Sequence, residues 1–122
     1  MNIKKVIAEH LLDDSALTGI VSDKIYRSRL PQGIKAPYVI VWLVDKERIL
    51  NHDGYAYTEA TVQISCYSHD PDEADEMAEI VRHSMESLPD VMDSFFDGES
   101  DIFEEATLIY HVACDYRISY HE

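Results

Sequence analysis

Hydrophobic residues near the start of the chain recur at helical spacing. They stand three or four positions apart, with charged residues between them, so that they fall on one side of a helix. These apolar positions are Ile3, Val6, Ile7 and Leu11. The pattern predicts an amphipathic helix over residues 3–12 with one buried stripe.

A short helix and a brief extended segment follow. Asp14 offers a side-chain cap for a helical turn that runs through Leu17 to Ile20. Residues 25–27 read as extended, and the Pro31-Gln32-Gly33 sequence then predicts a turn.

The next apolar run is continuous rather than periodic. Residues 38–44 are rich in β-branched and aromatic side chains, a composition typical of a strand that is covered on both faces. Asp53-Gly54 is a turn signal, and residues 55–67 form a second strand segment. The two segments predict a long antiparallel hairpin. Its tip, residues 46–52, is polar around one apolar pair, which predicts an arm that projects beyond the sheet.

A long helical pattern occupies the middle of the chain. Asp70 followed by Pro71 is a typical helix start, with further acids in the first turn. An apolar stripe continues to Leu88, and Pro89 stops it. The pattern predicts a central helix near residues 71–88.

The last third of the chain differs in its two halves. Residues 90–106 mix apolar side chains with many acids and predict a loop or an irregular β-segment. Residues 107–120 alternate with period two and predict a long final strand. Together the elements predict an α+β fold, in which a mostly antiparallel sheet with a long hairpin packs against the N-terminal and central helices. Because no repeat or linker divides the chain, residues 1–122 are expected to form one domain.

Charge is the unusual bulk property of the chain. It contains 24 Asp and Glu against 10 Lys and Arg, a formal net charge of -14. Such a surface repels a phosphate backbone and disfavours specific nucleic-acid binding, although DNA could slide past it without adhering. Acidity that serves solubility alone is the other interpretation. The N-terminal pattern is amphipathic and no stretch of 18 apolar residues occurs, so neither secretion nor membrane insertion is signalled.

No motif with catalytic or metal-binding chemistry stands out. Cys66 and Cys114 lack a zinc-type spacing and fall on the apolar faces of predicted strands, which favours buried reduced thiols. A disulfide between them requires that the two strands adjoin. The histidines are scattered, the glycines form no phosphate-binding loop, and solvated faces explain the acid pairs. The sequence therefore predicts no enzyme, no metal site and no cofactor.

Six short motifs stand in a fixed order along the chain. They are Asp14-Ser15-Ala16-Leu17-Thr18, Asp23-Lys24-Ile25-Tyr26, Leu30-Pro31-Gln32-Gly33, Pro37-Tyr38-Val39, Thr61-Val62-Gln63-Ile64 and Asp72-Glu73-Ala74-Asp75-Glu76-Met77-Ala78. In this order the chain resembles the small tail-completion or tail-terminator proteins of long-tailed bacteriophages.

The resemblance implies a non-enzymatic structural protein that terminates the tail tube and joins it to the head connector. It implies further copies of the chain as partners, in a ring expected to be a hexamer, together with tail-tube and head-connector proteins. The protein would reside in the virion, and in the host cytoplasm during assembly. Acids that line such a ring would let DNA pass through without adhesion. The resemblance assigns no catalytic or metal-binding residue.

Two groups of residues are candidates for subunit contact. Arg27 and Arg29 precede the turn in a chain that has few basic residues. Arg48, Ile49 and Leu50 belong to the predicted arm, which would clasp a neighbour by extending its sheet. Solvent exposure without a partner is the alternative for the arginines. Two other function classes stay open: an acidic adaptor or inhibitor domain that binds a basic protein, and a small hydrolase or binding domain whose pocket holds a titratable group of shifted pKa.

Overall fold

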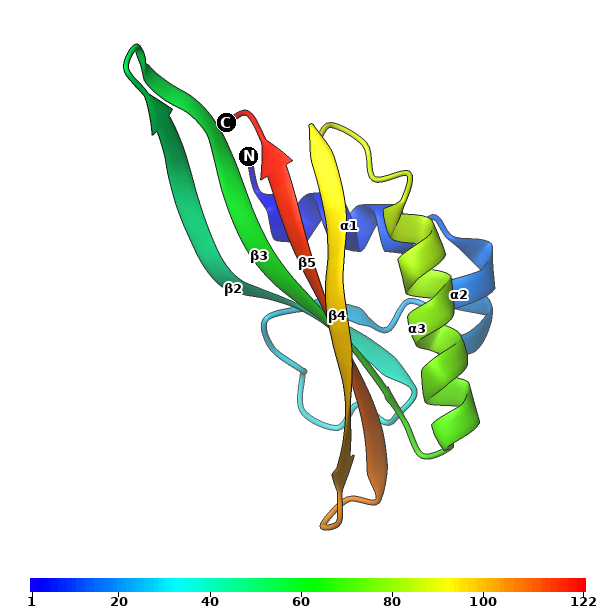
Figure 1. Cartoon of the computed structure of the whole chain (residues 1–122). Coiled ribbons are helices and arrows are strands. Elements are labelled where there is room, and N and C mark those ends of the chain that lie inside the picture. Colours follow the sequence, from blue (N-terminus) through cyan, green and yellow to red (C-terminus); the bar gives the residue numbers. More distant parts are fainter.

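Three helices cover one face of a single five-stranded sheet (Figure 1). The computed structural model describes residues 1–122. In chain order the elements are α1 (Ile3–Leu12), α2 (Ser15–Val21), β1 (Ile25–Arg27), β2 (Tyr38–Asn51), β3 (Gly54–Ser68), α3 (Pro71–Met85), β4 (Asp93–Glu104) and β5 (Ile109–Tyr120).

The strands lie side by side in the order β1-β2-β3-β5-β4. β1 runs parallel to β2, and every other neighbouring pair is antiparallel. The α+β class and the mostly antiparallel sheet with a long hairpin are therefore confirmed. β1 and β4 lie at the two outer edges, and β1 covers only the first residues of β2, from Val39 to Val41.

Each helix begins at a side chain that accepts a hydrogen bond from a backbone N–H group of the first turn. These caps satisfy donors that have no partner within the helix. The capping residues are Asn2, Asp14 and Asp70. The central helix ends at Met85 and not at Leu88 as predicted, but Leu88 is still buried, which explains why the apolar stripe continues past the helix end. None of the three helices is long and apolar enough to cross a membrane.

The main core lies between the helices and the sheet. Each side chain that is fully buried there contributes roughly 1.5–3 kcal/mol relative to an exposed one. Its most deeply buried members include Ile7 and Leu11 of α1, Leu17 of α2, Met77 and Val81 of α3, Ile64 of β3, and Tyr116 and Ile118 of β5.

A smaller cluster covers the start of β2 on the opposite face of the sheet. Tyr38 and Ile40 pack there beside Tyr67, under Leu30 and Ile34 of the segment that joins β1 to β2. The prediction that this strand is covered on both faces is confirmed for its first residues. Beyond Leu43 the side chains of β2 are mostly exposed.

The two cysteines are free thiols on neighbouring strands. Cys66 of β3 pairs with Val112, and Cys114 of β5 pairs with Ile64, so the two side chains are diagonal neighbours on the helix-covered face. Both are fully buried. Burial raises the pKa of the Cys66 thiol well above its ordinary value and that of Cys114 to about 12. The predicted buried reduced thiols are confirmed.

The structure corrects the prediction of a loop or irregular β-segment over residues 90–106. A strand, β4, runs from Asp93 to Glu104 along the edge of the sheet, and its register shifts by one residue between Phe96 and Gly98. This bulge and the partial exposure of both faces at an edge break the alternation that would reveal a strand in the sequence. β2 has a similar shift between Leu43 and Asp45.

Candidate functional site

The β2–β3 hairpin extends beyond the rest of the sheet as an arm. The last pair that joins β3 to β5 is Thr58 with Tyr120, so residues 49–57, here called the arm, pair only with each other (Figure 1). The predicted projection is confirmed, but its tip is placed differently. The segment predicted as the tip, residues 46–52, lies mostly within strand β2, and the chain turns at His52 and Asp53. A second register shift, between Ile49 and Leu50, distorts the arm.

A group of polar contacts fixes the base of the arm to the end of the chain. The Glu122 carboxylate lies 2.8 Å from the Met1 amino group and 3.2 Å from Lys46 Nζ. It also accepts a hydrogen bond from the Thr58 hydroxyl. These cations and donors, first of all the hydrogen bond from the amino terminus, lower the pKa of Glu122 to about 2. Tyr55, from the arm itself, reaches back to accept a hydrogen bond from the Glu122 backbone N–H at 3.0 Å.

The arm and the part of β2 below it expose apolar and basic side chains. Leu50 is 66% exposed, and Val44, in the bulge below the arm, is 61% exposed. The Arg48 guanidinium lies over the Tyr55 ring, 4.8 Å from its centroid. This contact orients Arg48 at the base of the arm without burying its charge. Ile49 pairs with Tyr57 and lies on the opposite face from Arg48.

The other predicted interface residues lie on the same lateral side of the sheet. Arg27 ends β1 opposite Val41, and Arg29 follows it; both are exposed. Seven residues of β2 separate the level of Arg27 from Arg48, a distance of roughly 20 Å at the rise of an extended chain. The structure thus places the two candidate groups along one edge but does not bring them into contact.

Two stretches of strand edge have no partner. β1 ends beside Val41, so the outer edge of β2 from Trp42 to Asn51 is free, and β4 pairs only with β5. Free edges present rows of N–H and C=O groups that can pair with another chain. β4 also exposes large apolar side chains between its acids, namely Phe95, Ile102 and Phe103. Sequence reasoning missed this edge because the acids obscured the strand.

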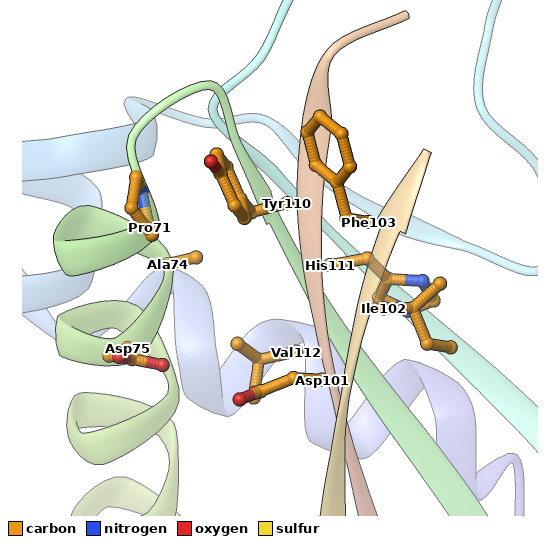
Figure 2. Close-up of a pocket in the computed structure, with 9 residues that line it drawn as sticks. All are labelled: Pro71, Ala74, Asp75, Asp101, Ile102, Phe103, Tyr110, His111 and Val112. Atoms are coloured by element: carbon orange, nitrogen blue, oxygen red, sulfur yellow. The ribbon is translucent and has the colours of Figure 1, made fainter. Parts of the chain in front are cut away.

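A cavity of about 280 Å³ lies where α3 begins, beside β4 and β5 (Figure 2). Asp75 of α3 and Asp101 of β4 point toward one another across it, and Ala74 and Val112 also line it. Neither carboxylate forms an ion pair within the chain. The remaining lining residues are Pro71, Ile102, Phe103, Tyr110 and His111.

His111 does not act together with these carboxylates. Its imidazole stacks on the Tyr67 ring, with centroids 4.2 Å apart, and in Figure 2 it points away from Asp75 and Asp101. Burial lowers the pKa of His111 and so favours the neutral ring, and this effect outweighs the opposing effect of Glu104, which raises the pKa. His111 therefore does not form an acid–base pair with either carboxylate of the cavity.

A second hollow, of about 380 Å³, is lined by polar residues of the helices. His10 Nε2 lies 2.7 Å from the Ser84 carbonyl oxygen, and Asp14 is engaged as the cap of α2. These side chains hold the helices together at this corner. No group of three or more His, Cys, Asp or Glu residues is arranged to hold a metal ion.

Comparison with known proteins identifies the family. The family model described as tail completion protein gp17 matches residues 5–121. A chain in the structure titled "Virion of native gene transfer agent (GTA) particle" is similar in fold, with a TM-score of 0.77 over 96% of this chain and 92% of that one, at 15% identity. No curated protein sequence matches the chain. Because the family match spans nearly the whole chain, the protein belongs to the tail completion protein gp17 family, as the order of its motifs predicted.

Proposed function

We propose that this protein terminates the tail tube of a phage-like particle and joins it to the head connector, as one subunit of a homo-oligomeric ring. The observation that carries the proposal is the family match over residues 5–121. The similar fold of a chain from a gene transfer agent virion supports a place in the particle itself. Before assembly the protein would reside in the host cytoplasm, and its role is structural rather than catalytic.

The arm and the edge below it are the proposed subunit contact. Leu50 and Ile49 offer apolar area, and Arg48 offers a charge held in place by Tyr55. An arm that projects from the sheet can add its strands to the sheet of a neighbouring copy. Arg27 and Arg29 would contact the same neighbour nearer the other end of this edge.

The face of the sheet opposite the helices is the proposed lining of a DNA channel. The strand register places an excess of carboxylates there, with Arg117 as the one Lys or Arg of the surrounding strands. The acids are Asp45, Glu47, Glu59, Asp93, Glu104 and Asp115. Like charge on this face would let DNA pass without adhesion, since a phosphate backbone is repelled by it. A ring whose lumen is neutral or basic would contradict this assignment.

The proposal is tested by removing the gene from a particle-producing strain and examining the particles by electron microscopy. We expect heads and tails that fail to join, and tails with an unfinished head-proximal end, both restored by the wild-type gene. Normal joined particles without the protein would refute the proposed function. An adaptor role predicts instead a stable complex with a basic protein and particles of normal shape.

A further inference from the structure

The basic and acidic residues of this chain are segregated to opposite edges of its sheet. Six of the ten Lys and Arg residues fall in the range from Lys24 to Arg48: Lys24 immediately precedes β1, and the other five lie on β1, on β2 or in the segment that joins them. No Lys or Arg occurs between Arg82 and Arg117, a span that contains β4 and nine acids. β1 and β2 lie at one side of the sheet, and β4 lies at the other. The β1–β2 edge therefore carries a net positive charge, although it contains Asp45 and Glu47, and the β4 edge carries only acids; they are called here the basic edge and the acidic edge.

Each edge repels a copy of itself. Two β4 strands paired with one another would bring Glu99 and Asp101 of each copy against the acids of the other, and like charges directly opposite are destabilising. The same holds for two basic edges that carry Arg27, Arg29 and Arg48. Only the contact between unlike edges joins opposite charges, and such a head-to-tail contact can be repeated from copy to copy.

The strand directions permit this contact in a ring. Along the sheet, β2 and β4 run in opposite directions, because β2, β3, β5 and β4 alternate. In a ring whose axis lies along the strands, every copy points the same way. The β2 edge of one copy then meets the β4 edge of the next in the antiparallel sense, and the helix-covered faces of the two sheets coincide.

Charged side chains of both edges project to the helix-covered face. Along the strand register, Glu99 lies level with Val41 and therefore with Arg27, whereas Arg48 lies seven residues further toward the arm. Arg48 pairs with Thr58, which is buried in the core side of β3, so Arg48 projects to this face. Glu99 and Asp101 project to the same face, because they pair with Cys114 and Val112 of the core. Asp101 also faces the cavity beside α3 and has no cation of its own chain.

We propose that the acidic β4 edge of one copy, with the carboxylates of Asp75 and Asp101 behind it, receives the basic β1–β2 edge of a second copy as an added antiparallel strand. The proposal rests on the ring of the proposed function and names its two contact surfaces. The occupant is a second copy of this chain, because its basic edge supplies both a free strand and the complementary charge.

Two charge-reversed variants test the proposal through the asymmetry of the contact. One carries Glu99→Lys and Asp101→Lys on the acidic edge, and the other carries Arg27→Glu and Arg48→Glu on the basic edge. A control for the acidic-edge variant, Glu9→Lys with Glu76→Lys, makes the same change in net charge on exposed helix positions. Sedimentation of each protein at low ionic strength measures self-association, and circular dichroism verifies folding.

We expect each edge variant to self-associate at least roughly a hundredfold more weakly than the wild type, because like charges then oppose each other across the contact. The control should behave as the wild type. An equimolar mixture of the two variants should associate again, because the intact edges are complementary and the Lys-bearing β4 edge of one variant meets the Glu-bearing β1–β2 edge of the other. Raising the ionic strength from about 0.05 to about 0.5 M should weaken the wild-type association, since the contact is charged.

Several outcomes would overturn the proposal: a wild-type protein that stays monomeric at low salt, edge variants that self-associate like the control, or a mixture that stays monomeric. None of these measurements decides the proposed function, which is judged by the morphology of particles made without the gene. Particles that fail to join, together with a mixture that stays monomeric, would retain the function and reject these contact surfaces.

Discussion

Replacement of the arm by a tight turn separates its role in assembly from its role in folding. Arg48 and Thr58 lie directly opposite each other, so residues 49–57 can be replaced by Asn-Gly, the preferred two-residue hairpin turn. The removed strands pair only with each other and contribute no residue to the main core. A two-stranded ribbon of this kind adds little stability by itself.

The expected loss of stability comes from one side chain. Tyr55 contacts the Thr58 hydroxyl at 3.1 Å and accepts the Glu122 N–H at 3.0 Å. At about 1 kcal/mol for each bond, the truncated protein should lose about 2 kcal/mol of unfolding free energy. For a chain of this length that corresponds to a fall in melting temperature of about 8 °C. Self-association, in contrast, should be lost.

Thermal unfolding and sedimentation of the same samples measure the two effects. Tyr55→Phe is the matched control, because it removes both hydrogen bonds but retains the arm. It should show most of the stability loss and assemble normally. A truncated protein that assembles like the wild type would refute the role of the arm in subunit contact. One that fails to fold would refute the conclusion that the arm is peripheral to the core.

Three further predictions follow from single groups. The Tyr116 hydroxyl is buried without a hydrogen-bond partner, so Tyr116→Phe should raise the unfolding free energy by about 1 kcal/mol, and a clear decrease in denaturation experiments would show that the hydroxyl has a partner. Glu122 has a pKa lowered from 4.5 to about 2, so its stabilising contribution is complete above pH 4.5 and is lost as the pH falls toward 2. The deficit in melting temperature of Glu122→Gln relative to wild type should therefore shrink over that range, and a deficit that stays constant would argue against the contacts with Lys46. Cys66 and Cys114 are buried with raised pKa values, so a thiol reagent at pH 8 should modify them only as fast as the protein unfolds. Rapid labelling of the native protein would contradict their burial.

The sequence predicts most of the elements because their signals are local. Asp14 and Asp70 mark helix starts through side-chain bonds to nearby backbone groups, and residues 109–120 alternate because one face of β5 is buried. β4 is different: it lies at an edge, exposes side chains on both faces and contains a bulge, so its pattern matches no simple period.

The candidate site depends on information that local patterns lack. Arg27, Arg29 and Arg48 could be chosen from composition, since basic residues are rare in this chain. The surface that complements them could not be chosen, because only the strand order shows that β4 lies at the opposite edge of the sheet. The cavity between Asp75 and Asp101 likewise joins residues of α3 and β4 that no spacing rule relates.

The bulges of β2 and β4 give the sheet a common line of bending. Leu43 pairs with Val62, Val62 with Tyr116, and Tyr116 with Phe96, so one row of residues crosses four strands and has a bulge beside each end. Bulges bend a strand and increase its twist locally. The strands β2 and β4, near the two sides of the subunit, therefore both bend at this row of paired residues. The curvature of a closed ring, and with it the number of copies it holds, would then be set by the angle at this row rather than by the chemistry of any one contact.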